Sequence, residues 1–287
     1  MSGRTDFKNF IIKSRLNITN CFKKKVPVRI PVYYGDLLED RVALITGSSS
    51  GIGYAIAEAF LRNGATVIIT GRDERRIERA KEKLAKISNH VFSASLDMED
   101  ADSFEEKIDT ITKKMNGKKI DILVNNAGVF SSGNFESITA RDYEKVLNTN
   151  LKGTFFLSQT IYKYFKKNKI KGNILNIASS SSMRPATNPY AISKWGIKGL
   201  TIGMAKKMIN DEIVVNAIAP GPTSTSMINK NENNISKSQH PLDRYIMPEE
   251  IANLAVFLVS SMGKMIVGDT VYMSGGLGVV TIDDLNY

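Results

Sequence analysis

Tyr190 and Lys194 lie four residues apart in the segment Tyr-Ala-Ile-Ser-Lys. On a helix this spacing places two side chains on one face, one turn apart. A phenol titrates near ~10, so it is a poor acid or base at neutral pH. An ammonium about 5 Å away, at an effective dielectric of about 20, favours the phenolate by roughly 3 kcal/mol, or about two pKa units. The pair therefore predicts a tyrosine that works as a general acid or base, although the same spacing also occurs by chance in helices.

A serine cluster precedes this tyrosine. Residues 173–178 are predicted to form a buried strand, which leads directly into Ser179. A hydroxyl at the end of a strand can lie beside the phenol and hold a substrate oxygen. The order of strand, serine and tyrosine is therefore the second part of a possible catalytic group.

A glycine turn near residue 50 gives an independent signal. Residues 42–46 are an apolar run typical of a central parallel strand, and an amphipathic helical pattern follows the turn. The turn contains Gly47, Gly51 and Gly53. Glycines in this position let the backbone approach a pyrophosphate, whose charge then lies at the helix N-terminus. The segment therefore predicts a dinucleotide site.

Together these residues resemble the short-chain dehydrogenase/reductase family, in its compact single-domain form. The resemblance rests on Thr-Gly-x-x-x-Gly-x-Gly at 46–53 and Tyr-x-x-x-Lys at 190–194, and it spans about residues 38 to 278. It implies an α/β single-domain Rossmann fold, with a doubly wound parallel seven-stranded sheet and helices on both faces. It also implies an oxidoreductase that interconverts a carbonyl and a secondary alcohol by hydride transfer.

The resemblance assigns four catalytic roles. Tyr190 is the acid or base, and Lys194 lowers its pKa and binds the nicotinamide ribose. Ser179 orients the carbonyl. Ser180 is the alternative, because the chain gives a spacing to the tyrosine of eleven or ten where the family usually has thirteen. Asn150 holds a water that links Lys194 to solvent, and capping within a kinked helix is its plainer role.

Further motifs are implied to contact the cofactor. Asp97 lies near the adenine, Asn126 belongs to the motif that ends the fourth strand, and Thr223 touches the carboxamide. The full implied set is Gly47, Ser49, Ser50, Gly51, Ile52, Gly53, Arg72, Asp97, Met98, Asn126, Ala127, Gly128, Tyr190, Lys194, Pro220, Gly221 and Thr223. One departure from the family is Ser274, where relatives usually have aspartate; we expect an effect on packing or on an interface.

Arg72 favours NADP(H) over NAD(H). An acidic residue about twenty positions past the glycines usually binds the ribose hydroxyls of NAD. Here the second strand ends in Gly71-Arg72-Asp73, and an arginine can pair with a 2′-phosphate. Asp73 has helix N-capping as its ordinary role. Ser50 weakens the case, since NADP-preferring relatives often have a basic residue in that turn, and NAD(H) remains possible.

The rest of the chain alternates between strand and helix patterns, which predicts right-handed crossovers and a parallel sheet. Strands are expected at 42–46, 66–70, 91–95, 121–125, 173–178, 213–218 and 270–273. Helices are expected at 52–63, 73–87, 99–115, 140–167, 190–209 and 248–260. Ligands of such sheets bind at the carboxyl ends of the strands.

Composition excludes several classes of protein. Cys21 is the only cysteine, so no intramolecular disulfide forms, which fits a reducing, cytoplasmic setting. The two histidines and one cysteine give no metal site of the zinc type. No run of about 18 apolar residues predicts a membrane span.

Residues 1–35 are a basic extension that precedes the catalytic domain of residues 36–287. The extension has eight Lys and Arg against one Asp, so it supplies +7 of the net charge of +10. The remaining +3 gives little support for nucleic-acid binding. We expect the extension to pack on its own domain or on a sister subunit. Alternatives are weak contact of residues 1–30 with anionic lipid or an acidic partner, and disorder.

Three functions remain open at this point. The leading hypothesis is an NADP(H)-dependent carbonyl or alcohol oxidoreductase acting on a small molecule. The second is an NAD-dependent polyol or sugar dehydrogenase with the same fold. The third is a nucleotide-sensing or scaffolding protein without turnover, although such proteins usually lose the tyrosine or the lysine. The resemblance implies a homodimer or homotetramer formed through the helices at 140–167 and 190–209.

Overall fold

The computed structural model describes residues 35–115, 117–131, 133, 135–228, 234–237 and 240–278. The basic extension therefore lies outside the described residues, apart from its last position. In the described ranges no helix is long and apolar enough to cross a bilayer. The same ranges contain no group of three His, Cys, Asp or Glu side chains placed to hold a metal ion.

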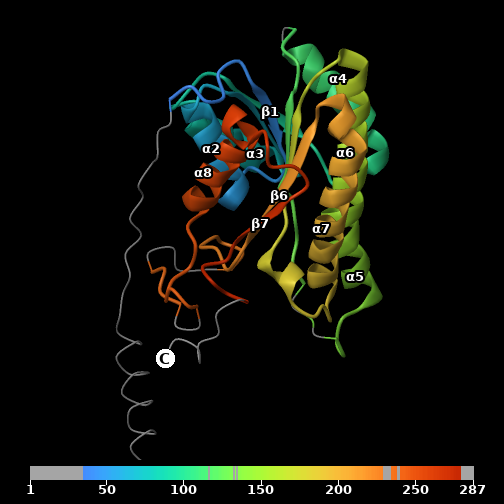
Figure 1. Ribbon diagram of the computed structural model, residues 1–287, viewed down its shortest axis with the longest axis vertical. Helices are drawn as coiled ribbons and strands as arrows, with labels where there is room; N and C mark the ends of the chain where they lie inside the picture. The colour runs from blue at the N-terminus through green and yellow to red at the C-terminus, as the bar shows by residue number, and fades with distance from the viewer. Residues whose placement is uncertain are drawn as a thin grey trace, which may run out of the picture.

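A seven-stranded parallel sheet forms the centre of the molecule, as predicted (Figure 1). Its order is β3-β2-β1-β4-β5-β6-β7, so the chain reverses direction across the sheet between β1 and β4. The strands are β1 (Val42–Ile45), β2 (Thr66–Gly71), β3 (Val91–Ser95), β4 (Ile122–Asn125), β5 (Asn173–Ile177), β6 (Val214–Pro220) and β7 (Thr270–Met273). The reversal marks the place where open sheets of this kind bind ligands.

Helices cover both faces of the sheet. Figure 1 shows α2, α3 and α8 on one face and α4, α6 and α7 on the other. The helices are α2 (Gly51–Arg62), α3 (Glu74–Leu84), α4 (Phe104–Lys114), α5 (Ala140–Leu147), α6 (Gly153–Asn168), α7 (Pro189–Met208) and α8 (Pro248–Val259). Helix α4 begins later than expected, because a 3₁₀ turn (Ala101–Ser103) precedes it.

The helix expected over 140–167 is interrupted. A π-helical turn, Asn148–Lys152, separates α5 from α6. Gly153 follows this turn. A β-carbon at this position would lie 2.3 Å from the Met98 carbonyl oxygen, so the chain passes closely beside the loop after β3. The π turn contains Asn150, and single π turns are frequent at functional sites.

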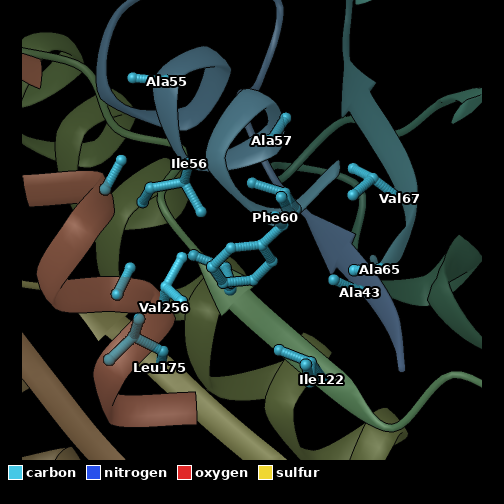
Figure 2. Packing of buried hydrophobic residues seen from close by; sticks show 14 of the residues in the cluster. Ala43, Ala55, Ile56, Ala57, Phe60, Ala65, Val67, Ile122, Leu175 and Val256 are labelled. Atoms are coloured by element: carbon cyan, nitrogen blue, oxygen red, sulfur yellow. The ribbon is translucent and has the colours of Figure 1, made fainter. Parts of the chain in front are cut away.

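The face that contacts α2 and α8 holds a dense apolar core. Phe60 is fully buried, and Figure 2 shows its ring directed from α2 toward Val256 of α8. Burying a side chain of this size contributes about 1.5–3 kcal/mol. Ile122 and Leu175 close the core from the sheet. The first helix after β1 is therefore held firmly, and with it the glycine turn that it follows.

Candidate functional site

The start of α7 sets the positions of Tyr190 and Lys194. The Asn188 side chain caps the helix by accepting the Ala191 N–H at 2.9 Å, and Pro189 occupies the first turn. Lys194 then lies one turn after Tyr190, with its Nζ 5.6 Å from the centroid of the tyrosine ring. Lys194 is only 5% exposed, and its Nζ donates to the carbonyl of Ile177 at 2.8 Å. The structure thus brings the predicted pair together at the end of β5.

Burial sets the pKa of both groups. It lowers the pKa of Lys194 to about 8. Burial also raises the pKa of the Tyr190 phenol, and a hydrogen bond with Ser179 opposes that rise. The net shift of the tyrosine pKa is opposite to the lowering that we expected, because desolvation of the phenolate is its largest cause. The phenol therefore keeps its proton at neutral pH, which is the form that can act as an acid.

Ser179 follows β5 and begins a 3₁₀ turn, Ser180–Met183. Its Oγ accepts the Ser181 N–H at 3.1 Å and bonds with the Tyr190 phenol. The tight turn takes up the short spacing before the tyrosine, and the Trp195 indole donates to the Arg184 carbonyl at 2.8 Å to hold the loop. Ser179, rather than Ser180, is thus the serine in contact with the phenol.

Asn150 connects three segments from a buried position, being 1% exposed. Its Oδ1 accepts the Val129 N–H at 2.8 Å, and its Nδ2 donates to the Val129 carbonyl at 3.0 Å. The same Nδ2 donates to the Ser193 hydroxyl at 3.2 Å, and that hydroxyl donates to the Tyr190 carbonyl at 2.7 Å. The asparagine thus ties the loop after β4 to the helix that carries Tyr190 and Lys194.

The glycine turn can hold a phosphate. Gly47 and Gly51 both have φ of 60°, which side chains adopt rarely. A β-carbon on Gly53 would lie 2.4 Å from Asn126 Nδ2, so a residue larger than glycine does not fit at this position. Within the described chain, Ser50 makes no side-chain cap on α2, and the first turn of that helix has no acidic residue. The N-terminus of α2 is therefore suited to an anion, and the residues present fit a pyrophosphate.

Asn126 fixes the turn from the neighbouring strand. Its Nδ2 donates to the carbonyls of Thr46 and Gly47, both at 2.9 Å. The Thr46 hydroxyl accepts the N–H groups of Asn126 and Ala127 at 2.9 and 3.0 Å. Gly128 follows, and a β-carbon there would lie 3.8 Å from Lys194 Nζ. The loops after β1 and β4 therefore form one hydrogen-bonded unit that reaches the lysine.

The adenine end predicted from the sequence lies beside β2 and β3. These strands pair with Gly71 opposite Ser95, which brings the following residue, Arg72, close to the segment 97–99. Arg72 Nη1 lies 3.7 Å from Glu99 Oε1, and the two side chains are 55% and 38% exposed. Asp97 Oδ1 accepts the Glu99 N–H at 3.0 Å.

Two other predicted residues of this end have clear surroundings. Met98 is 4% exposed and belongs to the apolar core that contacts α4 and α6. Asp73 accepts the Arg76 N–H at 3.1 Å, which is the N-capping role expected for it. Arg72 directly follows β2, and its side chain is 55% exposed.

The chain after β6 crosses toward the glycine turn. Pro220 ends β6, and the Thr223 hydroxyl donates to the Gly221 carbonyl at 2.9 Å. A β-carbon on Gly51 would lie 3.3 Å from Thr225 Cγ2, so this segment passes over the turn that contains Ser49, Ser50 and Ile52. The loops after β1, β4, β5 and β6 therefore meet at one edge of the sheet.

Ser274, the departure from the family pattern, takes part in loop packing. Its carbonyl pairs with His240 Nε2 at 2.9 Å, while His240 Nδ1 accepts the Leu242 N–H at 3.1 Å. A β-carbon on Gly221 would lie 3.1 Å from the Ser274 Cα. These contacts involve the backbone of Ser274, so the effect that we expected from serine in place of aspartate stays a prediction.

Sequence reasoning missed several side chains of the site. Ser193 and Glu99 make long-range contacts that their residue types did not indicate. Thr46 belongs to the glycine motif, but its hydrogen bonds with the loop after β4 were not expected. Phe130 is 58% exposed, and its ring packs edge-on against the Tyr190 ring at 5.4 Å. Its position two residues after the Asn-Asn-Ala-Gly segment could have indicated it.

A hollow of about 520 Å³ lies at the opposite edge of the sheet. Its lining includes Asp36, His90 and Lys118, which precede β1, β3 and β4, and Arg62, which ends α2. It shares no residue with the predicted set. We therefore place the candidate site at the carboxyl ends of the strands, where the predicted residues gather, and not at this hollow.

Comparison with known proteins agrees with this geometry. A family model described as Enoyl-(Acyl carrier protein) reductase matches residues 47–278. The chain belongs to the short-chain dehydrogenase/reductase family. Its relatives are oxidoreductases that act on CH–OH and C=O groups, and NAD(P)-dependent interconversion of a carbonyl and an alcohol is the function of the chain.

Individual relatives cover almost the whole described chain. A 3-oxoacyl-(acyl-carrier-protein) reductase of Aquifex aeolicus is 35% identical over 84% of this chain and 98% of the relative. A 3alpha-hydroxysteroid dehydrogenase of Mediterraneibacter gnavus is 33% identical over 83% and 97%. A short-chain dehydrogenase of Burkholderia cenocepacia, solved with NADP, is 27% identical with a TM-score of 0.74, over 83% of this chain and 98% of that one.

Proposed function

We propose that this dehydrogenase/reductase uses NADP(H) and that Asn150, Ser179, Tyr190 and Lys194 carry its chemistry. Tyr190 gives its proton to the oxygen of a carbonyl substrate during reduction and takes it back during oxidation. The observation that supports this most directly is the geometry at the end of β5, where Lys194 Nζ lies 5.6 Å from the centroid of the Tyr190 ring and Ser179 hydrogen-bonds with the phenol. The bound nicotinamide supplies or accepts the hydride.

Each neighbour of Tyr190 has a separate task. Ser179 orients the substrate oxygen toward the phenol. Lys194 holds the nicotinamide ribose, and its positive charge stabilises the tyrosinate that forms after proton transfer. Asn150 keeps the loop after β4 and the start of α7 in register through Val129 and Ser193. With these distances fixed before the substrate arrives, little reorganisation is needed in the reaction.

The preference for NADP(H) is supported by Arg72 and by relatives. Arg72 stands at the end of β2 with its side chain 55% exposed, and Gly71 before it offers no carboxylate to repel a phosphate. One solved relative contains NADP, and a polyketide ketoreductase with a TM-score of 0.77 and 26% identity contains NADPH. The remaining cofactor contacts are proposed for the glycine turn, Asp97 and the loops ending in Gly128 and Thr223.

The substrate is proposed to be a small carbonyl compound or its alcohol. Phe130 places an aromatic surface beside Tyr190, which favours an apolar group next to the reacting carbon. No contact in the described chain favours the hypothesis of an NAD-dependent polyol or sugar dehydrogenase.

Assembly into a homodimer or homotetramer is proposed to use α5, α6 and α7. Phe155 and Phe156 on α6 are 45% and 37% exposed, and Trp195 on α7 is 42% exposed. Exposed aromatic side chains on adjacent helices are typical of protein interfaces. We also propose that residues 1–35 form an extension separate from the catalytic domain, and that the single-cysteine chain works in the cytoplasm.

The test is the Tyr190→Phe variant. We expect it to lose about 10²- to 10⁴-fold in kcat with a panel of ketones and NADPH, because the proton donor is removed. NADPH affinity should stay within about threefold, since the ring and Lys194 remain. Tyr162→Phe, whose hydroxyl bonds Asp211 far from the site, is the matched control. Turnover that survives Tyr190→Phe would refute the proposed role.

A further inference from the structure

Glu99 lies at the edge of the proposed adenine site and has no role in the function described so far. Its Oε1 is shared by two partners: Arg72 Nη1 at 3.7 Å and the Thr149 hydroxyl, which donates to it at 3.1 Å. Its N–H is fixed by Asp97 Oδ1 at 3.0 Å. The carboxylate is therefore held by both backbone and side-chain contacts, and it is directed at the arginine proposed to select NADP(H).

The sheet explains this arrangement. Because β2 and β3 are parallel and Gly71 pairs with Ser95, Arg72 and the segment after β3 leave the sheet side by side. Thr149 approaches from the π turn, whose close contact with Met98 is marked by Gly153. Three segments therefore converge on one oxygen atom, and the Thr149 hydrogen bond holds that oxygen near Arg72.

We propose that Glu99 is a specificity-determining residue that weakens NADP(H) binding by competing with the 2′-phosphate for Arg72. The 2′-phosphate is anionic, so it needs the guanidinium that Glu99 already neutralises in part. NAD(H) has no charge at this position and does not enter the competition. Glu99 thus narrows the difference in affinity between the two cofactors. The inference rests on the proposed use of Arg72 for NADP(H).

The expected size of the effect follows from exposure. Ion pairs between half-exposed groups contribute about 0.2–1 kcal/mol, which corresponds to roughly a 1.4- to 5-fold change in affinity. Salt screens such pairs strongly, with a Debye length of about 10 Å at 0.1 M. The change should therefore be small, specific to NADP(H), and weaker at high salt.

The experiment is a titration of NADPH and NADH fluorescence with the full-length wild type and Glu99→Gln. We expect Glu99→Gln to lower the Kd for NADPH by roughly 1.4- to 5-fold and to leave the Kd for NADH unchanged. The gain should shrink in 0.5 M NaCl, since screening weakens the pair it removes. Glu105→Gln, an exposed carboxylate in the first turn of α4, is the matched control for loss of one charge.

A double-mutant cycle separates competition from a simple change in net charge. In the Arg72→Ala background, Glu99→Gln should change the Kd for NADPH by less than it does in the wild type. An equal change in both backgrounds, an unchanged ratio of the two Kd values, or weaker NADPH binding would overturn the inference. If wild type binds neither cofactor, the proposed function fails instead, so the two failures are distinguishable.

Discussion

The two ends of the proposed site, the catalytic end and the adenine end, differ in how firmly the protein holds them. At the catalytic end, Asn150 and Lys194 are 1% and 5% exposed, and each makes hydrogen bonds of 2.8 to 3.2 Å to neighbouring segments. At the adenine end, Arg72 and Glu99 face solvent, and one contact of 3.7 Å joins them. The catalytic end fixes geometry before binding, whereas the adenine end can rearrange around a ligand.

Physical chemistry gives this difference a direction. A buried polar group that loses its partner costs about 1–3 kcal/mol, while an exposed ion pair contributes about 0.2–1 kcal/mol. Substitutions at the catalytic end should therefore change both the stability of the protein and the rate of the reaction. Substitutions at the adenine end should change only the affinity and choice of cofactor.

Lys194→Met should produce the largest effect, and it should separate activity from stability. We expect kcat to fall by about 10²- to 10⁴-fold, because the charge that supports proton transfer is lost. The folded protein should become more stable near pH 7, because a buried ammonium is replaced by an apolar side chain of similar length. Lys206→Met, in the exposed last turn of α7, is the control for both measurements.

The pH dependence of this variant provides a sharper check. The folded-state pKa of Lys194 is about 8, below its ordinary value of 10.5. Between these two values the unfolded chain binds more protons, so the stability of the wild type rises with pH across that window. The stability advantage of Lys194→Met should therefore shrink from pH 8 to pH 10 in thermal melts. A constant difference between the two proteins over this range would contradict the burial of the charge.

The sequence predicted the strands and helices around this site better than the contacts between its side chains. The alternation of strand and helix patterns predicted all seven strands, and β1 is an apolar run because a central parallel strand is buried on both faces. The Tyr190 and Lys194 pair followed from helical spacing together with the serine before it and the glycine turn. The sign of the tyrosine pKa did not, since spacing shows a charge nearby but not the desolvation that outweighs it.

Contacts between distant segments were beyond the sequence for a related reason. Asn150 bonds Val129 and Ser193, and no local pattern links these positions before the π turn is known. Glu99 meets Arg72 only because β2 and β3 pair in one particular register. Residue type and order predicted where loops gather, but not which donor meets which acceptor.

Asn150→Ala should have an intermediate effect and should test whether the catalytic end is one unit. The substitution leaves the Val129 N–H and carbonyl without their side-chain partner, at a cost of about 2–5 kcal/mol in the free energy of unfolding. It should also lower kcat while leaving the Kd for NADPH within about threefold. Asn148→Ala, on the same π turn but only half-buried, should cost under about 1 kcal/mol. Equal losses in urea unfolding would show that the π turn tolerates both changes alike.

Arg72→Ala should have the smallest effect on the stability of the protein, and it is the most direct test of the contrast between the two ends of the site. The side chain stands 55% exposed, so the free energy of unfolding should change by less than about 0.5 kcal/mol. The Kd for NADPH should rise by about tenfold, equivalent to about 1.4 kcal/mol, because one charge-assisted contact is lost. The Kd for NADH and the kcat at saturating cofactor should stay unchanged, since neither depends on the 2′-phosphate. A fall in kcat with saturating NADPH would mean that the adenine end is coupled to Asn150 through Glu99 and Thr149, and that the two ends do not work independently.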